Sequence, residues 1–190
     1  SNKWMIGTVN SFFIGFIATF IATTLGTLAA LGLSRPHMPY KGLIMAILIS
    51  PMIVPLIITA AGMFFFYARI NLVYSFTGII LAHVALATPF VVITVTATLV
   101  GFDMNMVKAA QSLGARPVRT FFKVIMPLIL PGVISGALFA FITSFDEVVI
   151  VMFMGSLDQL TIPKQMWAGI RQEISPVILC MATCLVILSI

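Results

Sequence analysis

The 190-residue chain has a formal net charge of +5, but only 8% of its residues are charged and 61% are hydrophobic. A soluble globular domain carries about 25% charged residues, so this composition excludes a water-covered surface and indicates an integral membrane protein. The positive charges are too few and too scattered for the phosphate-binding stripe of a nucleic-acid-binding protein, which excludes nucleic acid as a partner.

Apolar segments follow one another along the whole chain. They are Met5–Leu33, Leu43–Phe66, Leu72–Val100 with its membrane part expected from Gly78, Ile125–Phe145 with an extension toward Met154 left open, and Pro176–Ile190. Each is predicted to be a helix, because an open chain in lipid satisfies its backbone hydrogen bonds only within helices. The predicted fold class is therefore all-α, a polytopic helical membrane protein with five visible spans.

The two ends of the sequence are expected to lack part of the membrane domain. The last apolar segment has 15 residues, fewer than the ~20 that a transmembrane helix needs. The chain also begins at Ser1 rather than at Met. We expect six spans in the native protein, with the first span and the end of the last one outside this sequence.

Prolines in or beside the spans are predicted to kink helices, because proline removes a backbone donor. They are Pro51, Pro55, Pro89, Pro127 and Pro131. Cys180 and Cys184 lie one helical turn apart in the last segment. We predict that both are buried packing residues rather than parts of a disulfide or a zinc site.

Positive residues are distributed unequally over the connections between spans. One side carries six of them: Arg35, Lys41, Lys108, Arg116, Arg119 and Lys123. The other side carries Lys3, Arg69, Lys164 and Arg171 together with the acidic residues Asp146, Glu147, Asp158 and Glu173. The positive-inside rule makes the first side cytoplasmic, so the Lys108–Pro127 loop faces the cytoplasm and the N-terminus lies outside.

Small residues recur at every fourth position in two of the predicted spans. One row consists of Ala22, Gly26 and Ala30, and the other of Gly132, Gly136 and Ala140. Such rows let helices approach each other closely in a membrane. Chance scatter in a chain rich in Gly and Ala is the alternative explanation.

The cytoplasmic connection after the third span contains a short helix with defined ends. Asp103 can cap its start, and the pattern from Met104 to Leu113 is helical. One face is apolar and has small side chains: Met106, Ala109, Ala110 and Leu113. Gly114 can adopt the left-handed conformation that ends a helix, and Pro117 prevents simple continuation, so a basic loop is expected to follow.

Three interpretations of this short helix remain open on spacing alone. It is an interfacial helix on lipid headgroups, although such helices usually present bulky Trp, Phe or Leu side chains. Alternatively, the connection is basic only to fix the topology. The third interpretation is a docking element for a cytoplasmic partner.

The same stretch resembles the "EAA" signature of ABC-importer permeases, which reads E-A-A-x-x-x-G and, nine residues later, I-x-L-P. The matching residues are Lys108-Ala109-Ala110, Gly114 and Val124-Ile125-Met126-Pro127. Lys108 stands where the signature has Glu and reverses the charge at its first position. The resemblance implies that Lys108, Ala109, Ala110, Leu113, Gly114, Val124 and Pro127 couple the chain to an ATPase.

Other stretches extend the resemblance over essentially the whole chain. "GTLAALGLSRP", "ISPMIVPLII", "SFDEVVIVMF" and "TIPKQMWAGIRQEISPVI" look like the permease subunit of spermidine/putrescine-type importers. The similarity starts at that family's second transmembrane helix. It implies an ABC type I importer permease fold, with one transmembrane domain over 1–190 and a coupling-helix segment at 103–121, in a bacterial inner membrane.

The resemblance also implies partners for this chain. Two permease subunits, the second one a paralogue, would form the pathway with an ABC ATPase dimer and an extracytoplasmic substrate-binding protein. The sequence has no G-x-x-x-x-G-K-[ST] loop, so ATP and Mg²⁺ are expected on the ATPase and no cofactor on this chain. The chain would be a transport subunit rather than an enzyme, and the expected substrate is a polyamine such as spermidine or putrescine.

Acidic residues inside an apolar run are the second candidate site. Asp146 and Glu147 are costly in a membrane and usually face a cavity or a partner. They would attract a cation along the pathway, with Thr88 and Ser144 completing the tentative set. The alternative is an interfacial pair that bonds a neighbouring helix or the binding protein, and the lone His83 is expected to be a helix-contact residue.

Rival functions make distinguishable predictions. A secondary transporter would need inverted repeats with paired broken helices, and no second copy of the Lys108–Pro127 pattern is present. A permease for another small solute, such as an amino-acid derivative or another organic cation or anion, is the main alternative. Neither a hydrolytic triad nor a metal-binding cluster is recognisable in the sequence.

Overall fold

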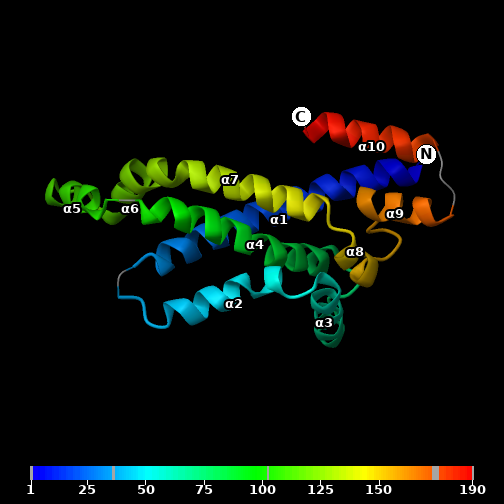
Figure 1. Cartoon of the computed structure of the whole chain (residues 1–190), viewed down its shortest axis with the longest axis horizontal. Coiled ribbons are helices and arrows are strands. Elements are labelled where there is room, and N and C mark those ends of the chain that lie inside the picture. The colour runs from blue at the N-terminus through cyan, green and yellow to red at the C-terminus, as the bar shows by residue number, and fades with distance from the viewer. Residues whose placement is uncertain (1, 36, 102, 173–175, 190) are drawn as a thin grey trace.

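The computed structural model describes residues 2–35, 37–101, 103–172 and 176–189, and within these ranges every regular element is a helix (Figure 1). The predictions made for Glu173 and Ile190 lie outside the described residues. Three stretches, Lys3–Leu33, Phe76–Val100 and Pro117–Phe145, are long and apolar enough to cross a membrane. A bent pair of helices would supply a fourth span.

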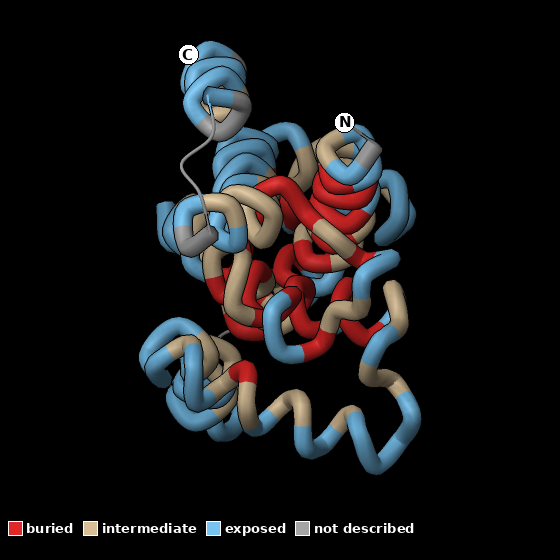
Figure 2. Tube along the Cα trace, turned by 90° about the vertical axis from the view of Figure 1, so that its right-hand side faces the viewer, coloured by how far each residue is buried: buried red, intermediate tan, exposed pale blue. Residues whose placement is uncertain are grey.

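The centre of the molecule consists of α1 (Asn2–Leu33), α4 (Phe76–Val100) and α7 (Met126–Phe145), which lie side by side (Figure 1). The middle helix, α4, packs on both of the others and contributes the largest share of buried residues, from Ile79 to Val95. Figure 2 shows the buried segments gathered where these helices meet. The apolar core of the chain is therefore a three-helix contact centred on α4.

The two rows of small residues, for which close approach to another helix was predicted, both face α4. Ala22, Ala30 and Ala140 are completely buried. A Cβ atom at Gly26 would lie 2.6 Å from the Cβ of Val91, and one at Gly136 would lie 3.0 Å from the Cα of Val91. The close-approach interpretation is confirmed, because Gly26 and Gly136 pack from different helices against the same residue of α4.

The second apolar segment is not one straight span. It consists of α2 (Lys41–Ile53) and α3 (Leu56–Arg69), which are bent by 104° relative to each other. The bend follows from Pro55, because a residue before proline is driven out of the helical region, and Val54 has φ −71° and ψ 135°. The expectation of a single helix over Leu43–Phe66 was wrong at this point.

The fourth span begins at Pro117, before the predicted Ile125, and it ends at Phe145 without the extension toward Met154. Helix α6 (Pro117–Thr120) continues through a π-helical turn, η1 (Phe121–Ile125), into α7. The expected basic loop is thus helical, because proline is well suited to the first helical position and starts this helix rather than stopping one. At the other end α7 stops at Phe145, and α8 (Val149–Met154) is a separate short helix.

Helices α9 (Ile162–Gln172) and α10 (Pro176–Ser189) complete the described chain. Helix α10 contacts α9 and stands away from the buried centre in Figure 2. Cys180 and Cys184 are free and exposed on it, so the prediction that they are buried packing residues was wrong. The error arose because the apolar run around them has little of the bundle to pack against.

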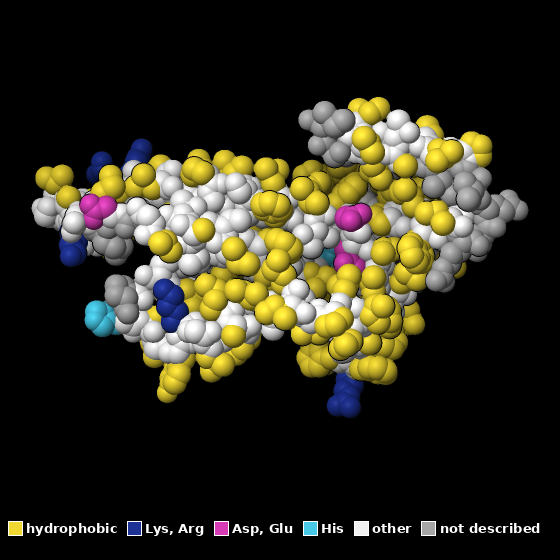
Figure 3. All heavy atoms as spheres, in the orientation of Figure 1, with side chains coloured by type: hydrophobic (Ala, Val, Ile, Leu, Met, Phe, Trp, Pro, Cys, Tyr) yellow, Lys and Arg dark blue, Asp and Glu magenta, His cyan; other side chains and the backbone are white. Residues whose placement is uncertain are grey.

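Charge separates the two ends of the bundle. Helices α1 and α4 run in one direction and α7 returns, so the α1–α2 connection lies at the same end as α5 and α6 (Figure 1). Figure 3 shows Lys and Arg side chains gathered at this end. The N-terminus, α8 and α9 lie toward the opposite end. The arrangement agrees with the cytoplasmic side assigned by the positive-inside rule.

Candidate functional site

The basic end carries the short helix expected after the third span. Helix α5 (Met104–Ser112) begins at Asp103, whose side chain accepts a hydrogen bond of 2.9 Å from the Asn105 backbone N–H. It ends at Leu113, and Gly114 follows with φ +82°, in the left-handed region that favours glycine. The predicted start and stop signals are both confirmed.

Helix α5 rests on α6 and η1 through one side and leaves the other side open. Val107 is buried, whereas Met106 is 48% exposed and Leu113 is 87% exposed. Ala109 and Lys108 are exposed as well. Most of the apolar face predicted from the sequence is therefore exposed, with Ala110 half-buried, and Val107, which was not in the predicted set, anchors the helix.

The other predicted coupling residues lie on the helix that follows. Val124 is half-buried in η1, and Pro127 is exposed in the first turn of α7. Ala110 is half-buried and Gly114 is exposed. The structure thus brings the α5 residues together at one tip and places Val124 and Pro127 next along the chain, on the element against which α5 packs.

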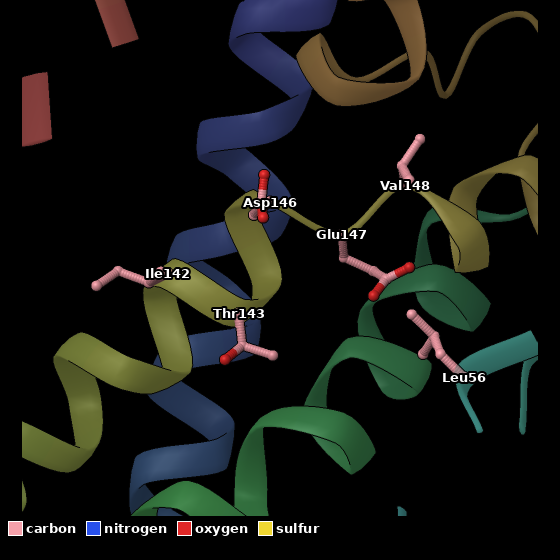
Figure 4. A pocket seen from close by; sticks show the side chains of 6 residues that line it. All are labelled: Leu56, Ile142, Thr143, Asp146, Glu147 and Val148. Atoms are coloured by element: carbon pink, nitrogen blue, oxygen red, sulfur yellow. The ribbon is translucent and has the colours of Figure 1, made fainter. Parts of the chain in front are cut away.

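The second candidate site is the break between α7 and α8. A cavity of about 350 Å³ opens there, lined by Leu56, Ile142, Thr143, Asp146, Glu147 and Val148 (Figure 4). Asp146 is exposed, and Glu147 is only 7% exposed. In Figure 4 their side chains point in different directions from the α7–α8 connection. Leu56 comes from the start of α3, so the bend in the second segment helps to form the cavity.

The two acidic side chains have different surroundings. The Oε1 atom of Glu147 accepts a hydrogen bond of 2.9 Å from the Ile150 backbone N–H. A carboxylate at this position satisfies an unpaired N–H group of the first helical turn and complements the helix dipole. Both carboxylates line the cavity: Glu147 also binds the start of α8, and Asp146 is the more exposed of the two.

The remaining pathway candidates, Thr88 and Ser144, do not line this cavity. The Oγ1 of Thr88 donates to the carbonyl of Val84 within its own helix, at 2.7 Å. Ser144 is buried, and its Oγ lies 2.8 Å from the Nδ1 of His83. The prediction that His83 is a helix-contact residue is confirmed, because this bond joins α4 to α7.

Metal-ligating side chains are scattered in this structure. In the described part of the chain, no group of three or more His, Cys, Asp or Glu side chains is arranged to hold a metal ion. The two candidate sites are an exposed apolar helix face among positive charges at one end, and a carboxylate-lined cavity with apolar walls nearer the other end.

Comparison with known proteins gives a family match over most of the chain. Residues 22–190 match the family described as "Binding-protein-dependent transport system inner membrane component". The segment from α5 to α7 and the α7–α8 break both lie within the matched range.

Two curated relatives carry the name of a transport permease. The spermidine/putrescine transport system permease protein PotC of Haemophilus influenzae is 32% identical over 96% of this chain and 71% of its own length. The putrescine transport system permease protein PotI of Escherichia coli is 30% identical over 90% of this chain and 63% of its own length. The aligned region thus spans about two thirds of these relatives.

A solved structure shares the fold. One chain of the inward-facing MetNI methionine ABC transporter superimposes with a TM-score of 0.75 and 18% sequence identity, covering 97% of this chain and 88% of that chain. The overall arrangement of the helices is accordingly the fold of that transporter chain.

Proposed function

Because this chain belongs to the family of binding-protein-dependent transport system inner membrane components, we propose that it is the membrane-spanning permease subunit of an ATP-driven importer. It would form half of a translocation pathway, the other half being a second permease, a paralogue of this chain. The observation that carries the proposal is the exposed apolar face of α5, presented at the basic end by a helix that is otherwise anchored by Val107.

Energy must reach the pathway through contact with another protein. The sequence lacks the loop that cradles ATP phosphates, so ATP and Mg²⁺ would bind to an ABC ATPase dimer in the cytoplasm. The open face of Met106, Ala109 and Leu113 is apolar and would dock into a groove on that ATPase. ATP binding would move the groove, and α5 would pass this movement to η1, on which it packs. Because η1 runs directly into α7, the movement would reach the membrane-spanning helix.

The test of this function is the energy source. Membrane vesicles containing the complete complex should lose substrate uptake when the P-loop Lys of the partner ATPase is replaced by Ala, and the loss should exceed tenfold because phosphoryl transfer then lacks its main electrostatic contact. The measurement is uptake of radiolabelled substrate with the membrane potential held constant. Uptake that follows the membrane potential and ignores the ATPase substitution would instead identify a secondary transporter.

A polyamine is the proposed substrate class. The relatives named above transport spermidine and putrescine, and the cavity at the α7–α8 break combines a carboxylate with the apolar side chains of Leu56, Ile142 and Val148. Such a lining fits a molecule that alternates ammonium groups with methylene chains. Another small organic solute, including an amino-acid derivative, is the alternative, and competition assays with unlabelled solutes distinguish it.

Asp146→Asn should raise the KM for polyamine uptake. An exposed carboxylate contributes about 1 kcal/mol to the attraction of one ammonium group, which corresponds to roughly a fivefold change in KM. The measurement is initial uptake rate against spermidine concentration at constant binding-protein concentration. Asp158→Asn is the control, because Asp158 is exposed near the outer end and does not line the cavity. An unchanged KM in Asp146→Asn would leave this residue only a role in helix packing or in contacting the binding protein.

A further inference from the structure

Helix α8 is held at both ends by charged side chains from outside the helix. At its start, Glu147 accepts a hydrogen bond from the Ile150 backbone N–H at 2.9 Å. At its end, the ammonium of Lys164 donates to the carbonyls of Val151 and Gly155, at 3.0 and 2.9 Å. A negative charge at the start and a positive charge at the end are the arrangement that the helix dipole favours.

The side chains along α8 are also tightly packed. Ile150, Val151 and Met154 are completely buried, and the carbonyl of Met154 accepts a hydrogen bond of 2.9 Å from the Tyr74 backbone N–H. A Cβ at Gly155 would lie 2.7 Å from the Val151 carbonyl oxygen. There is thus little room for α8 to shift without breaking these contacts, and a displacement at one end must move the other.

The two ends of α8 face different parts of the molecule. Glu147 lines the cavity at the α7–α8 break, together with Leu56 from α3. Lys164 belongs to α9, an amphipathic helix at the outer end whose Trp167 is 45% exposed and whose Ile170 is 55% exposed. Short helix α8 is therefore the direct link between an outer surface and the wall of the cavity (Figures 1 and 4).

Lys164 is a charged residue in a position that is partly buried between helices. It is half-buried, and burial lowers the pKa of its ammonium group. A positive charge is placed in such surroundings at a cost, which the two carbonyl contacts offset. The Gly155 carbonyl lies just past the end of α8, and the Val151 carbonyl accepts from the Gly155 backbone N–H as well as from Lys164. An apolar side chain of the same length would fill the space but leave both carbonyls without this donor.

We propose that Lys164 is a positioning residue that fixes α9 to α8 and thereby holds the Glu147 wall of the cavity in place. A protein that binds the outer face of α9 and shifts it would move α8 through Lys164 and widen the cavity. This inference rests on the proposed function, in which an extracytoplasmic binding protein delivers the substrate to this end of the permease.

The test measures access to the cavity in the complete complex. Cys180 and Cys184 are replaced by Ser, because both are exposed and would react, and Thr143→Cys places a single thiol in the cavity lining. The rate of modification by a membrane-impermeant maleimide added from outside is then compared between Lys164 and Lys164→Met. Loss of a charged hydrogen-bond donor should increase the rate roughly tenfold, with ATP hydrolysis raised in the absence of binding protein.

Two further variants separate positioning from general damage. Lys164→Arg retains a charged donor and should restore the parental labelling rate, whereas Lys3→Met removes an exposed lysine from the same end and should change nothing. Should Lys164→Met fail to assemble, Lys164→Gln keeps one N–H donor at shorter reach and should give an intermediate rate. A parental labelling rate in every assembled Lys164 variant overturns the proposal.

Two different outcomes separate the role of Lys164 from the permease function. Parental labelling in Lys164→Met, combined with uptake that still requires the ATPase, would remove the role of Lys164 and leave the permease function standing. Uptake in the parent complex that does not require the ATPase would remove the proposed function, whatever the labelling rates show.

Discussion

Replacing Gly136 by Val should prevent the bundle from assembling, although the new side chain is apolar and small. A Cβ at this position would lie 3.0 Å from the Cα of Val91 and 2.5 Å from the Oγ1 of Thr94. The first of these atoms is backbone and cannot rotate away. Overpacking in a filled core costs about 1–3 kcal/mol where neighbours can shift, and more where they cannot.

Helix α4 also cannot move away from the new side chain, because Val91 is packed from both sides. A Cβ at Gly26 of α1 would lie 2.6 Å from the Cβ of Val91, so α4 cannot retreat from α7 without meeting α1. The expected result is a loss of most of the folded, membrane-inserted protein. Fluorescence-detected size-exclusion chromatography of a tagged chain, run against temperature, measures it.

A control is provided by a glycine that has open space around it. Gly62 lies in α3 with nothing within 4 Å of a built Cβ, so Gly62→Ala should be neutral or stabilising by up to about 1 kcal/mol. If Gly136→Val gave the same monodisperse yield and melting temperature as Gly62→Ala, the three-helix contact around Val91 would not be what holds the bundle together.

The sequence predicted the core better than it predicted the breaks. Hydropathy located the helices, and the spacing of small residues identified the faces of α1 and α7 that approach a neighbour. It could not identify α4 as the neighbour of both, because spacing within a helix contains no information about its partner. The only sequence signal for the sharp bend at Val54 was the proline that follows it. This signal is ambiguous, because Pro51 and Pro89 lie inside helices without a comparable break.

The candidate sites show the same limit. The ends of α5 were predictable because Asp103 and Gly114 act through local backbone geometry. The partner of Glu147, an N–H group three residues away, is local too, although α8 itself was not predicted. Lys164 and Leu56 were not foreseen in their roles, because each reaches its site through a tertiary contact that no local pattern encodes.

Ala109→Trp should separate this chain from its ATPase while leaving the permease folded. Ala109 is exposed on the open face of α5, so the larger side chain meets nothing within the described protein and the bundle should keep its stability. It would, however, fill the space that a docking groove needs to approach the helix backbone. We expect at least a tenfold fall in substrate-stimulated ATP hydrolysis and in ATPase retained on the purified permease.

The control for this prediction lies on the same helix. Gln111 is also exposed, but it lies about 160° around α5 from Ala109, so Gln111→Trp adds equal bulk on a side away from the proposed groove. Retention of the ATPase in Gln111→Trp and its loss in Ala109→Trp would assign docking to the Met106–Ala109–Leu113 face. Equal retention in both variants, with ATP hydrolysis intact, would mean that α5 is not the contact through which energy enters.

A substitution at Lys108 tests whether charge, as well as shape, contributes to ATPase docking. It is exposed on the tip that carries most of the basic residues, so a groove that receives α5 should offset its positive charge. Lys108→Glu would then weaken ATPase retention most at low salt, where charge interactions are least screened, and the difference from the parent should shrink as salt is raised. Lys108 stands where the permease signature that this stretch resembles has Glu, so a loss in Lys108→Glu would indicate that the ATPase presents a negative charge to this position.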